Sequence, residues 1–212
     1  MISTISKKVP RFITTSRHNA VVDVLKEEIN RLRKQHLPHG TKRLYQDVIF
    51  NLTKENHSVI PGNDVDKQTI KILADSAIKS YNEQGIFSGR VNEFGNHMET
   101  HIKSAGDIKV IKPFTLHGKK QDTGYPDRFV ETPTGKFYLE IKVFGKQQGA
   151  SKQRTFYLCN ANKITTSCPH YLLGFEHEEK TLTGHIHIID MFNKNLKLKC
   201  EWATDNYELY QV

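Results

Sequence analysis

The sequence predicts an α/β or α+β domain in which helices come first and a β-sheet follows. Apolar residues recur at helical spacing over much of the first ninety residues. From Ile108 onward, β-branched and aromatic residues dominate and alternate with polar ones, as they do in strands. The connections are mostly short, and no repeat or low-complexity tract interrupts the 212 residues. We therefore expect a single domain over residues 1–212, with a mainly helical part at 1–90 and a sheet-containing core at 91–212.

Four segments have the apolar spacing of helices. In the longest, 65–84, Ile70, Leu73 and Ala77 fall on one side, and Gly85 follows as a favourable helix terminus. The other helices are predicted over 16–32, 44–53 and 93–105.

Six segments have the composition of strands. In the clearest, 137–144, alternate residues such as Phe137 and Leu139 define one apolar face. The preceding Thr132-Pro133-Thr134-Gly135 has turn chemistry, which predicts a hairpin with strand 125–132. The other strands are predicted over 108–116, 154–159, 170–175 and 185–191, and the polar stretch around Glu178 is predicted to be a loop.

The chain carries an excess of positive charge, with 31 Lys and Arg against 23 Asp and Glu and a formal net charge of +8. A basic domain attracts polyanions, above all nucleic acid, because Lys and Arg neutralise phosphates and release counterions. A surface charge that only keeps the protein soluble accounts for the same excess. Charge alone leaves both interpretations open.

Composition also excludes several classes of protein. No apolar run approaches the ~20 residues that span a bilayer, and the N-terminus lacks the order of a signal peptide. Three cysteines, Cys159, Cys168 and Cys200, have no paired spacing, so they indicate neither a disulfide framework nor a tetrahedral zinc site. We expect a cytoplasmic protein with no membrane partner.

Residues that can carry out chemistry are concentrated in 124–143. The predicted hairpin places Asp127 on one strand and Glu140 on its neighbour. Glu140 and Lys142 are two residues apart, so both project from one face of their strand. Two carboxylates gathered in this way suit Mg²⁺, which takes one or two carboxylates together with water and phosphate oxygens. The sequence therefore predicts a divalent-metal site at Asp127 and Glu140.

Such a site implies phosphodiester hydrolysis. A metal at Asp127 and Glu140 polarises a scissile phosphate and lowers the pKa of a bound water. Lys142 orients or helps to deprotonate that water, or stabilises the charge that develops on the phosphate. The alternative is a structural network in which both carboxylates pair with Lys136 or Arg128 on the sheet face.

An acid two residues before a lysine is a weak signal by itself. The pattern occurs three times, as Asp107-x-Lys109, Glu140-x-Lys142 and Glu178-x-Lys180. Only Glu140-x-Lys142 lies in an apolar strand and follows Pro126-Asp127 across a turn. That combination distinguishes it from the other two.

This segment resembles the PD-(D/E)XK nuclease superfamily, the fold of most type II restriction endonucleases. Pro126-Asp127 matches the PD element and Glu140-Ile141-Lys142 matches (D/E)XK, within a similar region over about 92–144. The resemblance implies a restriction-endonuclease-like α/β core with a mixed central β-sheet flanked by helices. It also implies a homodimer that cleaves double-stranded DNA with Mg²⁺, for which Mn²⁺ substitutes.

The resemblance further implies roles for individual residues. Asp127, Glu140 and Ile141 are the implied metal-binding positions, and Lys142 completes the catalytic set. Families of this fold often supply one more acid from a helix before the first core strand, and Glu99 stands in that place. A salt bridge between Glu99 and Lys103, four residues apart on one helix, is the alternative.

A second basic feature lies just after the predicted catalytic strand. From Ile141 through Phe175 there is no Asp or Glu, while five cations including Lys163 fall there. Lys and Arg neutralise phosphates or read guanine, and Gln and Asn read adenine edges. We expect DNA contacts, rather than an ordinary polar loop, from Lys146, Gln147, Gln148, Lys152, Gln153 and Arg154, joined by Lys119 and Lys120 from the loop before Asp127.

Taken together, these features predict a Mg²⁺-dependent endodeoxyribonuclease that cleaves double-stranded DNA at a specific short sequence, as a type II restriction enzyme does. Two alternatives remain. One is a repair or recombination nuclease of the same fold that reads DNA structure, and the other is a non-catalytic basic DNA-binding protein.

Overall fold

The computed structural model describes residues 42–90, 93–121, 124–146, 158 and 161–198. The predicted helix 16–32 and nearly all of the predicted strand 154–159 lie outside these residues. The chain divides into two compact units, Arg43–Leu196 and a second that combines Met1–Lys42 with Lys197–Val212. The features discussed below belong to Arg43–Leu196, and a single domain over 1–212 stays a prediction.

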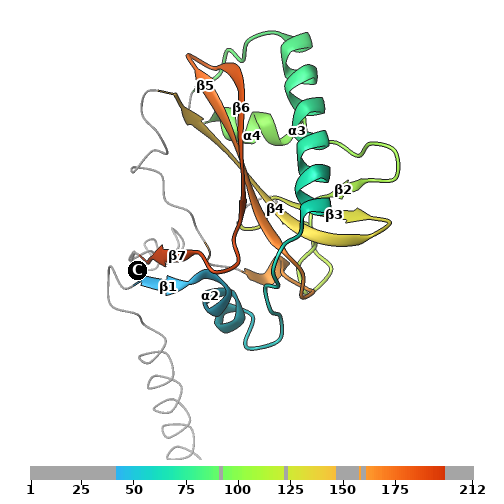
Figure 1. The fold of residues 1–212 in the computed structure, drawn as a ribbon, viewed down its shortest axis with the longest axis vertical. Coiled ribbons are helices and arrows are strands. Elements are labelled where there is room, and N and C mark those ends of the chain that lie inside the picture. Colours follow the sequence, from blue (N-terminus) through green and yellow to red (C-terminus); the bar gives the residue numbers. More distant parts are fainter. Residues whose placement is uncertain (1–41, 91–92, 122–123, 147–157, 159–160, 199–212) are drawn as a thin grey trace, which may run out of the picture. The chain divides into compact units, whose positions relative to one another are not determined.

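A mixed five-stranded sheet forms the centre of the unit Arg43–Leu196 (Figure 1). In spatial order its strands are β2 (Lys109–Ile111), β3 (Arg128–Thr132), β4 (Gly135–Gly145), β5 (His170–Glu178) and β6 (Thr181–Asp190). β4 and β5 are parallel, and the other neighbouring pairs are antiparallel. Two short strands, β1 (Lys42–Leu44) and β7 (Asn195–Lys197), form a separate pair. The mixed central sheet is therefore confirmed.

In the described part of the chain, three α-helices accompany the sheet, α2 (Tyr45–Leu52), α3 (Asp64–Gln84) and α4 (Phe94–Glu99). α3 begins where the Asn63 side chain accepts a hydrogen bond from the Asp66 backbone N–H at 2.8 Å. It ends at Gly85, whose φ of 87° suits glycine. The predicted helices 44–53 and 65–84 are confirmed. Among the described residues, no helix is long and apolar enough to cross a membrane.

α4 is shorter than the predicted helix 93–105. The backbone N–H groups of Thr100 and His101 each donate to the carbonyl three residues earlier, which tightens the chain at the end of α4. Ala105 and Ile108 then pair across a turn. These bonds end the helix at Glu99 and lead the chain into β2.

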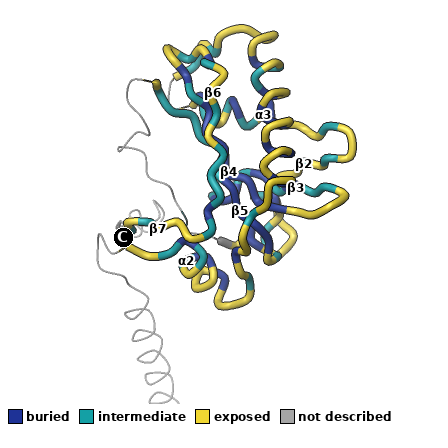
Figure 2. Tube along the Cα trace, in the orientation of Figure 1, coloured by how far each residue is buried: buried dark blue, intermediate teal, exposed yellow. Residues whose placement is uncertain are grey.

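The alternation of side chains along the strands produces a core on each face of the sheet. α3 and α4 cover one face, where they pack with Leu139, Ile141 and Leu173. α2 packs on the other face, where Tyr45 and Ile49 share a cluster with Tyr138, Leu172 and Ile189. Figure 2 shows that the middle of the sheet, along β4 and β5, is the most deeply buried part. The sheet is thus flanked by helices, as predicted.

The predicted strand 108–116 is wrong in its second half. β2 ends at Ile111, because Pro113 has no backbone N–H with which to continue the ladder. From Phe114 the chain turns back on itself and pairs with Lys120. This connection, which we call the 114–120 hairpin, holds two of the predicted DNA-contacting lysines.

The polar stretch around Glu178 is part of β5 rather than the predicted loop. Glu178 pairs with Thr181 across a two-residue turn, in which Glu179 and Lys180 both have positive φ. That backbone twist matches the twist of the two strands, so the hairpin closes tightly. β5 and β6 are longer than predicted for this reason.

Candidate active site

The β3–β4 hairpin brings the two predicted metal-binding carboxylates together. Its turn is held by Thr132, whose hydroxyl oxygen accepts the backbone N–H of Gly135 at 3.0 Å. Arg128 pairs with Leu139, and the same register continued by one residue sets Asp127 against Glu140. Asp127 Oδ2 accepts the Ile141 backbone N–H at 2.8 Å, which ties the carboxylate to β4.

Lys142 closes the cluster on its solvent side. Its Nζ forms an ion pair with Glu140 Oε1, lies 3.9 Å from Asp127 Oδ2 and donates to the Ile141 carbonyl at 3.2 Å. The Lys142 side chain is 42% exposed, against 6% for Glu140 and 15% for Asp127. Glu140 and Lys142 thus share a face, as predicted, and only the lysine is widely open to solvent.

Glu140 is held in an unfavourable environment. It is 4% exposed, and its Oε2 has no hydrogen-bond partner among the residues that the structure describes. Burial and then the neighbouring Asp127 raise the pKa of Glu140 to about 8, although Lys142 opposes the shift. Buried polar atoms are normally hydrogen-bonded, so an orphaned carboxylate oxygen indicates a missing partner.

Glu99, the third predicted acid, is bound to Arg128 rather than to Lys103. Arg128 donates through Nη1 to Glu99 Oε2 at 3.3 Å and through Nη2 to the Glu99 carbonyl at 2.7 Å. Arg128 Nη1 also donates to the Asp127 carbonyl at 2.8 Å. Burial and then Asp127 raise the pKa of Glu99, while Arg128 lowers it. Arg128 therefore joins the end of α4 to the residue that carries the first carboxylate.

The alternative of a structural network with Lys136 or Arg128 describes the site poorly. The Arg128 guanidinium contacts the Asp127 backbone and not its carboxylate, and Lys136 is exposed at the start of β4. The partner that both carboxylates share is Lys142.

A buried aromatic group supports the chain just before Asp127. The hydroxyl groups of Tyr45 and Tyr125 hydrogen-bond to each other and lie 2.9 and 2.7 Å from His170 Nδ1. Burial lowers the pKa of His170 to about 3, so its imidazole is neutral at ordinary pH. Sequence reasoning missed this group, because its members come from three distant segments.

Lys163 also lies where sequence reasoning did not expect it. Lys163 is one of the five cations in the segment without Asp or Glu, which predicts contact with phosphates. Its side chain is instead buried, with 2% exposed. Its Nζ donates to the carbonyls of Gly124 at 2.7 Å and Pro126 at 3.3 Å. A lysine within Asn162-Lys163-Ile164 carries no sequence signal that distinguishes it from the other basic residues.

The structure describes three of the predicted DNA-contacting residues. Lys119 and Lys120 are exposed on the 114–120 hairpin, and exposed Lys146 forms an ion pair with Glu178 at 3.3 Å. The remaining five lie outside the described residues: Gln147, Gln148, Lys152, Gln153 and Arg154.

The oxygen atoms at this site suit a hard divalent cation. No three His, Cys, Asp or Glu side chains of the described residues converge into a ready-made metal cage. Asp127 and Glu140 offer two carboxylates, and the Ile141 carbonyl lies beside Lys142 Nζ. Mg²⁺ typically takes one or two carboxylates and fills its remaining positions with water and phosphate oxygens. The orphaned Glu140 Oε2 is an available ligand, so the residues present fit such an ion.

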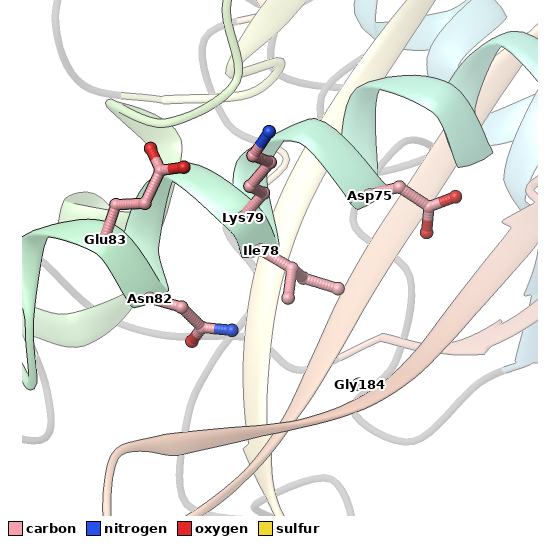
Figure 3. A pocket seen from close by; sticks show the side chains of 6 residues that line it. All are labelled: Asp75, Ile78, Lys79, Asn82, Glu83 and Gly184. Atoms are coloured by element: carbon pink, nitrogen blue, oxygen red, sulfur yellow. The ribbon is translucent and has the colours of Figure 1, made fainter.

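A shallow pocket of about 530 Å³ lies elsewhere in the unit (Figure 3). It is lined by Asp75, Ile78, Lys79, Asn82 and Glu83 of α3 and by Gly184 of β6. None of these residues belongs to the carboxylate cluster, so the candidate site is a feature of the hairpin surface and not of this pocket.

Comparison with known proteins points to one class of enzyme. Residues 40–212 match the model of the type II restriction enzyme MjaV family. The chain is also 30% identical over 216 residues to the type II restriction enzyme MjaV of Methanocaldococcus jannaschii, which covers 87% of this chain and 92% of the relative. No solved structure matches the chain. The matched region contains the whole β3–β4 hairpin and its carboxylate cluster.

Proposed function

Because the chain belongs to the MjaV family of type II restriction enzymes, and is therefore a site-specific deoxyribonuclease, we propose that Asp127, Glu140 and Lys142 form its catalytic centre. Of the functions that the sequence left open, family membership selects the site-specific endonuclease. The observation that supports this centre most directly is the buried, unpartnered Glu140 Oε2 beside Asp127 and Lys142.

The two carboxylates hold the metal ion in this proposal. Asp127, Glu140 and the Ile141 carbonyl are the protein ligands, and Mg²⁺ is the natural ion, with Mn²⁺ as a substitute. When bound, the ion polarises the scissile phosphate and lowers the pKa of a water molecule. Asp127 keeps its orientation because the Ile141 N–H binds its Oδ2.

Lys142 contacts the reacting groups. Its half-exposed ammonium can reach a phosphate that approaches from solvent while it stays next to both carboxylates. There it orients the attacking water and stabilises the negative charge that develops on the phosphate oxygens. The water oxygen bonds to phosphorus and gives up a proton to solvent, the bond to the 3′ oxygen breaks, and that oxygen takes a proton from solvent and leaves as a hydroxyl group.

Glu99 is the third acid of the proposed centre. Its carboxylate is partly buried at the end of α4, and Arg128 fastens it to the backbone of Asp127. The negative charge of Asp127 already raises the pKa of Glu99, which supports a position close to the metal-binding carboxylates.

DNA is proposed to lie across the face that carries Lys142. Beside Lys142 in the sheet register stand Gly174, which has no side chain, and then exposed His187. The Phe144 ring lies over Gly174 and packs edge-on against His187, so a substrate can reach the Lys142 ammonium only from its exposed side. Lys119, Lys120 and Lys146 supply phosphate contacts, and contacts to bases or phosphates come from Gln147, Gln148, Lys152, Gln153 and Arg154. A homodimer would present two such centres to a palindromic site.

Supercoiled plasmid tests the proposal. Wild-type protein is expected to yield discrete fragments with Mg²⁺ and none with excess EDTA. Asp127→Asn and Glu140→Gln are expected to lower cleavage roughly 1,000-fold, because each removes a negatively charged ligand of the metal ion that stabilises the transition state. Asp75→Asn is the matched control, since Asp75 is exposed on α3 and forms an exposed surface pair with Lys71.

Binding and cleavage are separated by a gel-shift assay without metal. Both site variants are expected to bind a cleavable fragment as wild-type protein does, because neither loses a cation that contacts phosphate. Cleavage at the wild-type rate by either variant refutes the assignment of that residue. Sequencing of the fragment ends identifies the recognition site.

A further inference from the structure

Lys163 is a buried cation next to the proposed catalytic centre, although it does not belong to it. It lies at the end of the short 3₁₀ helix Ala161–Lys163 and is 2% exposed. Its Nζ donates to the carbonyls of Gly124 and Pro126 at 2.7 and 3.3 Å. Those residues belong to the segment that delivers Asp127 to the start of β3.

A buried ammonium is costly unless nearby groups compensate its charge. Burial lowers the pKa of Lys163, and the negative charges of Asp127, Glu140 and Glu99 oppose that shift. Four cations surround these three acids, Arg128, Lys142, Lys163 and the exposed Lys112. Of the other three, Arg128 and Lys163 are buried and Lys142 is widely exposed.

The burial of Lys163 rules out a direct contact with DNA in this arrangement. Its contacts are instead with the chain that holds a proposed metal ligand. Arg128 donates to the carbonyl of Asp127 itself, and Lys163 donates to the carbonyls of Gly124 and Pro126, in the segment just before it. Two different cations thus hold the backbone in and before Asp127.

We propose that Lys163 is a positioning residue for cleavage: its ammonium fixes the 124–126 backbone so that the Asp127 carboxylate faces Glu140 and can bind the metal. This inference rests on the proposed function of Asp127. The same 3₁₀ helix also contacts the 114–120 hairpin, because the Asn162 carbonyl accepts the Leu116 N–H at 2.9 Å. Lys163 therefore lies between the hairpin that carries Lys119 and Lys120 and the segment that carries Asp127.

The test compares Lys163→Met with Lys163→Arg and with the control Lys180→Met. Lys180 is half-buried and donates to a backbone carbonyl, that of Gly89, at 2.5 Å. It lies beyond the end of β5, roughly 20 Å from the level of Glu140 at about 3.3 Å per residue. It matches Lys163 in chemistry and differs in its distance from the site.

Four quantities are measured for each variant: the melting temperature, the affinity for DNA without metal, kcat with Mg²⁺, and the affinity of the DNA-free protein for Mn²⁺ by calorimetry. Lys163→Met is expected to lower kcat and Mn²⁺ affinity about 10- to 100-fold each, as loss of a group that orients a metal ligand does. Its DNA affinity should stay at the wild-type value. Lys163→Arg should recover part of both losses, and Lys180→Met should change neither.

A folded Lys163→Met variant that keeps wild-type kcat or wild-type Mn²⁺ affinity overturns the inference. The inference is also overturned if Lys180→Met lowers kcat or Mn²⁺ affinity as much as Lys163→Met does. Such a result would show a general effect on stability. Should Lys163→Met be unfolded at the assay temperature, Lys163→Gln, whose amide can still donate to one carbonyl, takes its place with the same criteria.

Asp127→Asn, measured in the same series, separates this inference from the proposed function. Full activity of Asp127→Asn refutes the catalytic centre itself. An inactive Asp127→Asn together with a fully active Lys163→Met refutes only the positioning role.

Discussion

The replacement Glu140→Gln is expected to make the protein more stable while it lowers cleavage roughly 1,000-fold. Glutamine keeps the shape of the side chain and removes a charge that is buried at 4% exposure with one oxygen unpartnered. Active sites commonly hold such unfavourable groups, at a cost in stability. The gain is expected to depend on pH, which distinguishes it from an ordinary packing effect.

The size and sign of the gain follow from the pKa of Glu140. Burial raises it from 4.5 to about 8, so between these values the folded protein keeps a proton that the unfolded chain has lost. The wild-type free energy of unfolding should therefore fall as pH rises from 4.5 to about 8 and level off above. The slope is at most about 1.4 kcal/mol per pH unit, which sums to an upper limit of roughly 5 kcal/mol.

Urea unfolding of both proteins in EDTA, at intervals from pH 5 to pH 9, measures this difference. The stability of Glu140→Gln relative to wild type should be smallest at pH 5 and grow by at least about 1 kcal/mol by pH 8. Glu178→Gln is the control, because Glu178 is half-exposed and pairs with Lys146 at the surface. Wild-type and Glu140→Gln curves that run parallel across the range refute the reasoning.

Two further predictions concern Arg128 and the oligomeric state. Arg128→Met should lower the free energy of unfolding by about 3–5 kcal/mol, because it leaves the partly buried Glu99 carboxylate without its cation. The control Lys71→Met removes an exposed pair with Asp75 and should change the free energy of unfolding by less than about 1 kcal/mol in the same urea experiment. The proposed homodimer should have twice the chain mass of 24.4 kDa by light scattering, and a monomer that cuts both strands at full rate contradicts that proposal.

The catalytic hairpin could be predicted from sequence because its information is local. The turn at 132–135 and the alternation along 137–144 set a register, and the register alone brings Asp127 opposite Glu140. The same alternation puts Glu140 and Lys142 on one face. No distant contact was needed for any of these steps.

The supporting contacts could not be predicted, because they join segments far apart in the chain. Glu99 had a suitable partner four residues away in Lys103, but the tertiary fold brings Arg128 closer. Lys163 belonged to a basic stretch, and only the path of the chain after β4 turns its ammonium toward Gly124 and Pro126. The predicted end of β2 is wrong for a simpler reason: the strand-like composition continues past Pro113, although proline cannot donate to a strand ladder.

The order of these contacts along the chain has a consequence for a cell that synthesises this enzyme. A ribosome releases Asp127, Glu140 and Lys142 before it releases Lys163 and β5, and β4 acquires its parallel neighbour only when β5 has followed. A nascent chain therefore carries the reactive groups before it has the framework that aligns them. We therefore expect competence to cut only after translation has passed β5.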